Sequence, residues 1–213
     1  MKTVKFDNID SYSDWGIILR PIERPKPSPK YNYVSIPAKN GDLDLTEAFG
    51  DVFYENLSYP LEFNVIDSMN TWDSKLRTIT NYLHGQKRKV TFSDDPNYYY
   101  IGRITVNELS SDKSVGILSL DCNFEPYKYK HDITSISYEV SEGNTYEFTN
   151  GRMKVVPTIT LSDAMTITFN GNSYSLGAGS HKILNIQFVE GINTIGVTTG
   201  SGTLSCEYKE GEL

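Results

Sequence analysis

A tyrosine-rich hairpin directly after the chain's only convincing helix constrains the fold more than any other feature. Apolar residues at helical spacing run through residues 71–84, and Gly85 ends the pattern. A strand over residues 90–92, an acidic turn over 93–97 and a second strand over 98–106 follow. This order of elements predicts a mainly β domain with one helix, and it has the character of a scaffold and not of a reaction centre.

The helix is expected to bury one side. Its apolar residues are spaced four, three and four positions apart, namely Trp72, Leu76, Ile79 and Leu83. Asn70 or Thr71 is the expected N-cap, and Gly85 suits the left-handed conformation that ends many helices.

A proline-rich segment precedes the helix by about forty residues. Pro21, Pro25, Pro27 and Pro29 fall within nine positions, which excludes a helix and any central strand. Residues 31–36 then alternate like an edge strand, and a turn is expected at residues 40–42. We interpret this region as a semi-rigid extended arm, with a surface loop that wraps its own domain as the alternative.

The composition changes near residue 130, which predicts two domains, residues 1–128 with the helix and residues 129–213 as a small all-β sandwich. Earlier strands are expected at 4–6, 16–19, 52–66 with a bend or bulge at Pro60, and 116–124. Beyond the boundary, glycine and asparagine turns recur about every ten residues, as in a sandwich. The strands expected there are 145–148, 153–161, 165–169, 173–176, 182–188, 194–199 and 204–208.

Charge and composition exclude several classes of protein. The net charge is −7, with 4 basic and 9 acidic residues in 131–213, so neither domain offers the positive face that nucleic acid requires. We find no signal peptide and no apolar run of membrane-spanning length, which predicts synthesis in a cytoplasm. Cys122 and Cys206 lie in apolar strand patterns and are expected to be buried free thiols.

No pattern of residues predicts a catalytic, cofactor or metal site. The three histidines, His84, His131 and His181, are scattered, and Ser180 next to His181 lacks the strained turn of a nucleophile. Asp94 and Asp95 are expected to stabilise a turn instead of binding a cation. We therefore expect a protein that is not an enzyme and uses no cofactor.

The ordered series of these features resembles a known family. The series is the strand that enters Gly16, the proline-rich stretch, Ile36-Pro37, Gly41-Asp42-Leu43-Asp44, the strand from Tyr54 to Tyr59, the Trp72 helix that ends at Leu83-His84-Gly85, Phe92-Ser93-Asp94-Asp95-Pro96, Tyr99-Tyr100-Ile101-Gly102-Arg103 and Cys122-Asn123-Phe124-Glu125-Pro126-Tyr127. It resembles the distal tail protein of phages that have long non-contractile tails and infect Gram-positive bacteria. The resemblance covers residues 1 to about 128, and residues 190–195 are similar in pattern to the family's carboxy-terminal sandwich.

The resemblance implies a structural component of the virion. The first domain would have a sandwich-like fold and form a ring, expected to be a hexamer, at the end of the tail tube, and the second would be a galectin-like β-sandwich. The implied partners are further copies of the chain, the tail tube protein, a tail-tip or tail-associated protein and a receptor-binding protein. The implied location is the tail tip, after synthesis in the cytoplasm of the bacterial host.

A closed ring needs a head-to-tail contact between copies, and the arm could supply it. We therefore predict that the ring seam includes Pro25, Pro27, Pro29, Tyr31, Tyr33 and Ile36. The alternative is a carbohydrate-binding sandwich that contacts glycans of the host surface. Residues 131–213 contain no tryptophan, so a sugar platform there would depend on tyrosines, namely Tyr138, Tyr146, Tyr174 and Tyr208.

Overall fold

The computed structural model describes residues 2–66, 68–112 and 115–213, and these residues are mostly in β-strands. Two compact units divide the chain. The first unit runs to Lys128 and takes in Leu213, and the second spans Tyr129–Glu212. Each unit has its own apolar core.

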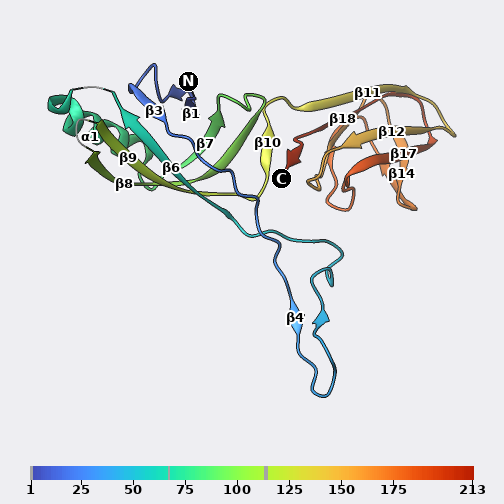
Figure 1. Ribbon diagram of the computed structural model, residues 1–213. Coiled ribbons are helices and arrows are strands. Elements are labelled where there is room, and N and C mark those ends of the chain that lie inside the picture. Colours follow the sequence, from blue (N-terminus) through green and yellow to red (C-terminus); the bar gives the residue numbers. More distant parts are fainter. Residues whose placement is uncertain (1, 67, 113–114) are drawn as a thin grey trace. The chain divides into compact units, whose positions relative to one another are not determined.

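One curled antiparallel sheet forms the first unit (Figure 1), with strands in the order β2-β1-β7-β8-β9-β6-β3. The strands are β1 (Val4–Phe6), β2 (Ile9–Asp10), β3 (Ile17–Leu19), β6 (Leu57–Val65), β7 (Lys87–Phe92), β8 (Tyr98–Asp112) and β9 (Val115–Phe124). Buried residues alternate with accessible ones along β6 and β9, so one face of the sheet covers the core and the other meets solvent.

The predicted hairpin is confirmed as β7 and β8. Its register runs from Lys87 opposite Arg103 to Val90 opposite Tyr100. Tyr100 packs into an aromatic cluster, where its ring stacks on Phe124 at a centroid distance of 5.2 Å. Cross-strand packing therefore accounts for Tyr100.

Pro60 does not create the expected bend or bulge. The ladder between β6 and β9 is continuous from Leu57 opposite Phe124 to Val65 opposite Gly116. Proline is tolerated because β3 pairs only with residues 63–65, so β6 has no second neighbour at Pro60 that would need its N–H. The strand also begins at Leu57 and not at residue 52, since residues 52–56 belong to the arm.

The helix α1 (Trp72–Leu83) buries the predicted stripe, with Trp72, Ile79 and Leu83 inside the core and Leu76 against it. The predicted side-chain cap is wrong. A 3₁₀ turn, η1 (Met69–Thr71), precedes the helix, and the Thr71 hydroxyl donates to the Ser68 carbonyl at 2.8 Å instead of accepting from the helix. The left-handed stop is confirmed, because Gly85 has φ of +72°.

The second unit is a β-sandwich of two four-stranded sheets. One has the order β11-β18-β13-β16 and the other β12-β17-β14-β15, and residues of both sheets share one core. The strands are β11 (Thr134–Val140), β12 (Thr145–Asn150), β13 (Thr158–Leu161), β14 (Met165–Phe169), β15 (Asn172–Leu176), β16 (Gly179–Lys182), β17 (Gly191–Thr199) and β18 (Gly202–Tyr208). Two short strands, β10 (Lys128–Lys130) and β19 (Gly211–Glu212), pair with each other.

Some strands of the second unit differ from the sequence prediction. Residues 134–140 form a strand that was not expected. The expected strand over 182–188 ends at Lys182, and the one over 153–161 starts only at Thr158. Between these elements a single bridge joins Val155 to Phe188, so both segments bury apolar side chains without a regular ladder. Apolar alternation alone cannot separate such segments from strands.

Both cysteines are buried and free, as predicted. Burial raises the pKa of the Cys206 thiol to about 12 and also raises that of Cys122.

Candidate functional site: the arm of the first unit

A long two-stranded arm leaves the sheet of the first unit between β3 and β6 (Figure 1). Its paired strands are β4 (Tyr33–Val34) and β5 (Leu43–Asp44). Further main-chain hydrogen bonds extend the ribbon: the Lys30 N–H donates to the Phe53 carbonyl at 2.7 Å, and the Glu55 N–H donates to the Ser28 carbonyl at 2.8 Å. We use "the arm" for residues 26–56.

The arm has no core of its own. From Ser28 to Asn56 no residue is buried. Large apolar side chains are nevertheless exposed along it, namely Tyr31, Tyr33, Val34, Ile36, Leu43, Phe49 and Phe53. An isolated two-stranded hairpin is only marginally stable in water, and contiguous exposed apolar surface usually marks an interaction site. The exposed apolar side chains of the arm make it the candidate interaction surface of the first unit.

Two tyrosines form the most ordered apolar feature of the arm. The rings of Tyr31 and Tyr33 stack with their centroids 5.6 Å apart and their planes 16° apart. Alternate residues of a strand face the same side, which brings these two rings together. Their residues are 63% and 55% exposed, so the stack is available to a partner.

An arginine fixes the root of the arm to the sheet. The Arg24 guanidinium forms an ion pair with Asp94, and it also lies 4.5 Å from the centroid of the Phe92 ring. Lys2 pairs with the same carboxylate at 3.1 Å. Burial by itself would raise the pKa of Asp94, but the hydrogen bonds from Arg24 and Lys2 outweigh it and hold the pKa below its usual value.

The acidic turn is thus occupied by ion pairs. Besides Asp94, the neighbouring Asp95 accepts from the Lys128 ammonium at 2.9 Å. Both carboxylates lie in the turn between β7 and β8, where the Asp95 N–H donates to the Phe92 carbonyl at 3.0 Å. The two carboxylates hold neighbouring segments of the first unit together.

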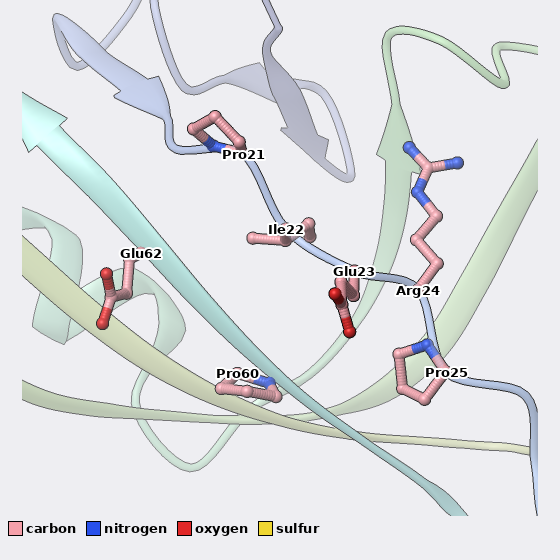
Figure 2. A pocket seen from close by; sticks show the side chains of 7 residues that line it. All are labelled: Pro21, Ile22, Glu23, Arg24, Pro25, Pro60 and Glu62. Carbon is pink, nitrogen blue, oxygen red and sulfur yellow. The ribbon is translucent and has the colours of Figure 1, made fainter.

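A shallow groove of about 450 Å³ marks where the arm leaves the sheet (Figure 2). Pro21, Ile22 and Pro25 line it from the proline-rich segment, and Pro60 and Glu62 line it from β6. The Glu62 carboxylate forms an ion pair with Arg20 at 3.0 Å. Glu23 and Arg24 also line the groove, whose surface is mainly apolar, and we assign it to the joint between arm and sheet.

The predicted seam residues fall into two groups. Tyr31, Tyr33 and Ile36 are exposed on the arm, and Pro25 is exposed at its root. Pro29 is half-buried and bridges to Tyr54 of the return strand. Pro27 is buried within its own unit and therefore anchors the arm. Reasoning from the sequence missed Phe49 and Phe53, which are exposed on the return strand, although their apolar character in a polar stretch was a readable signal.

His84 and His181 form hydrogen bonds to the main chain of their own units. The His84 Nδ1 accepts a hydrogen bond from the Val106 N–H at 3.2 Å. The His181 ring bonds to the Gly177 carbonyl, and the Ser180 hydroxyl bonds to Thr160 instead of to that ring. Within residues 2–66, 68–112 and 115–213, no group of three or more potential ligands could hold a metal ion.

The tyrosines that could serve a sugar site in the second unit are committed to packing. Tyr138 donates to the Glu147 carbonyl at 2.7 Å, Tyr146 accepts from the Ser141 N–H at 2.9 Å, and Tyr208 donates to Thr149 and is buried. None of these three rings, nor that of Tyr174, is exposed. No helix in the part of the chain that the structure describes is long and apolar enough to span a membrane.

Comparison with known proteins places this fold. No family model and no curated protein matches the sequence. The crystal structure of the Dit (gp 19.1) protein of SPP1 is similar to this chain with a TM-score of 0.73, and the alignment covers 100% of both chains at 15% sequence identity. SPP1 Dit is described as a paradigm of the hub adsorption apparatus in phages that infect Gram-positive bacteria. The chain shares the fold of this phage hub protein over its whole length.

Proposed function

We propose that this chain is a structural protein of a phage tail, a distal tail protein whose copies close into a ring, expected to be a hexamer, at the end of the tail tube. The observation that carries the proposal is the arm, which exposes apolar side chains on a ribbon without a core. The shared fold with a phage hub protein supports the same function. In this reading the chain has no enzymatic activity.

The arm suits a head-to-tail contact. In a ring, each copy must present one surface to the next copy and a different surface to the previous one. An arm that leaves the body satisfies this requirement, because it can lie on a neighbour while the body of its own unit stays free. Tyr31, Tyr33 and Ile36 are the apolar residues of the seam in this proposal, with Phe49 and Phe53 added.

The ring would connect the tail tube to the tail tip. On one side the partner is the tail tube protein, and on the other a tail-tip or tail-associated protein together with a receptor-binding protein. The protein would be made in the cytoplasm of the host and function in the virion. The sandwich of the second unit would supply an additional attachment surface.

Shortening the arm tests the proposal. The Lys30 N–H and the Phe53 carbonyl are 2.7 Å apart, so an Asn-Gly turn can replace residues 31–52 without moving the anchored root. Native mass spectrometry should find the full chain near 145 kDa, since six copies of 24.1 kDa are needed, and the shortened chain as a monomer.

Thermal unfolding serves as the control, because the deleted residues contribute nothing to either core. The shortened chain should still unfold cooperatively, at a temperature below that of the full chain because assembly adds stability to the ring. Assembly of the shortened chain into the same ring would exclude the arm from the seam. A full chain that never forms rings, alone or with purified tail tubes, would refute the proposed function.

A further inference from the structure

The two strands of the arm carry opposite charges. The outgoing strand, residues 26–40, contains Lys26, Lys30 and Lys39 and no acidic residue. The returning strand, residues 41–56, contains no basic residue, and its acidic residues are Asp42, Asp44, Glu47, Asp51 and Glu55. A ribbon with such segregated charge presents a distinctly acidic side to whatever lies beside it.

The acidic side is not neutralised by its own arm. Asp42, Glu47 and Glu55 form no ion pair with any described residue. In the ribbon Lys30 lies opposite the apolar Phe53. Asp44 is occupied locally, since its carboxylate accepts from the Thr46 side chain and from the Thr46 N–H at 2.9 Å, and these two hydrogen bonds lower its pKa.

A basic strip lies on the solvent face of the sheet in the same unit. It consists of Lys5 on β1, Lys87 and Lys89 on β7, and Arg103 on β8, all exposed. Lys5 alternates with the buried Val4 and Phe6, which places it on the outer face. The pairing of Lys87 with Arg103, and of β1 with β7, brings the four cations together.

Acidic residues balance this strip only in part. Lys87 forms an ion pair with Glu125, and Lys5 lies opposite Asp10 in the β1–β2 pair. Lys89 instead lies 5.0 Å from the centroid of the Tyr99 ring, a contact that leaves its positive charge in place. The strip therefore keeps a net positive charge, and its cations alternate along strands as the acidic residues of the arm do.

We infer that the returning strand of the arm docks on the basic strip of a second copy of this chain. The acidic strand and the basic strip are complementary in charge, and both belong to the same chain, so a second copy can supply the surface that receives the arm. The exposed Phe49, which lies between Glu47 and Asp51 in the sequence, would be covered in the same contact. The inference rests on the proposed function, since it names the surface that receives the arm in the ring. Because the acidic strand and the basic strip are two different surfaces of one chain, their contact between copies is head-to-tail, as ring closure requires.

Charge reversal on full-length chains tests the inference. One variant carries Asp42→Lys and Glu47→Lys on the arm, and the other carries Lys5→Glu and Lys89→Glu on the strip. The four side chains are exposed and take part in no ion pair of the described chain. Glu142→Lys with Glu147→Lys, two exposed residues of the second unit, is the matched control.

Native mass spectrometry of each variant and of the equimolar mixture is the measurement. We expect each reversed variant to stay at 24.1 kDa because like charges then meet, while the control assembles as the unchanged chain does. The mixture should assemble near 145 kDa with equal numbers of the two variants, since every seam then joins opposite charges. High salt should weaken the unchanged ring, because it screens exposed charges.

The outcomes separate this inference from the proposed function. If the strip variant assembles alone, or if the mixture stays monomeric while the unchanged chain forms rings, the arm docks elsewhere and the inference is wrong. A contact between the acidic strand of one arm and the lysines of the next would let the strip variant assemble alone, because the arm of that variant is unchanged. An unchanged chain that forms no ring even with tail tubes refutes the proposed function itself.

Discussion

Replacing the stacked tyrosines of the arm should dissolve the proposed ring without unfolding the subunit. The change is Tyr31→Ala together with Tyr33→Ala. Both residues are more than half exposed, and neither belongs to a core. The folded monomer should therefore lose only the stacking energy between the two rings, about 1 kcal/mol, and this loss affects the arm alone.

The effect on assembly follows from the exposed area. An aromatic side chain can bury about 200 Å², and the exposed fractions of 63% and 55% leave the pair roughly 240 Å² to offer a partner. Burial of half of this area at about 25 cal/mol per Å² contributes about 3 kcal/mol to each seam. Loss of this energy should weaken each seam about 100-fold, since about 1.4 kcal/mol corresponds to a factor of ten.

A dilution series followed by native mass spectrometry measures the loss. The double variant should fall apart at a concentration about two orders of magnitude above the one at which the unchanged ring dissociates. Leu184→Ala is the matched control, because Leu184 is 73% exposed but lies in the second unit. Equal dissociation of the double variant and the unchanged chain would show that the tyrosine stack is not in the seam.

Three further predictions concern the units themselves. Tyr59→Phe should raise the free energy of unfolding by about 1 kcal/mol in chemical denaturation, because the Tyr59 hydroxyl is buried without a hydrogen-bond partner among the described residues; a loss of stability would reveal a partner for it. Asp94→Asn should lower the free energy of unfolding of the first unit at neutral pH, because the pKa of Asp94 is lowered from 3.8 in the folded chain. The difference in unfolding free energy between variant and unchanged chain should be full above pH 3.8 and vanish as the pH falls through the folded pKa. A difference that persists in strong acid would contradict the ion pair with Arg24. Cys122 and Cys206 should resist thiol reagents at pH 8 in the native chain and react on denaturation, because burial raises both pKa values; rapid labelling of native protein, counted by mass, would contradict the buried positions.

Features that depend on neighbours in the sequence could be predicted well. The stripe of α1, the stop at Gly85 and the hairpin of β7 and β8 depend on periodicity and turn chemistry within a few residues. The turn at Asn170 and Gly171 is equally local: both residues have positive φ, and the turn joins β14 to β15. The sequence also indicated that the proline-rich segment leaves the sheet, because proline excludes it from a ladder.

Features that depend on distant segments could not be predicted. Whether residues 182–188 continue a strand depends on which segment lies beside them, and the side-chain cap expected at Thr71 failed because a 3₁₀ turn precedes the helix. The root of the arm is fixed by Arg24 and Asp94, which lie seventy positions apart. No local pattern pairs such residues.

By itself, the sequence determined the segregated charge of the arm, since that is a property of the order of residues in 26–56. Only the tertiary structure decided that this segment is a coreless ribbon, and that Lys5 and Lys89 meet on one face of a sheet. The physical reason is the register of β1 against β7, because a shift by one residue would turn Lys5 towards the core and remove it from the basic strip.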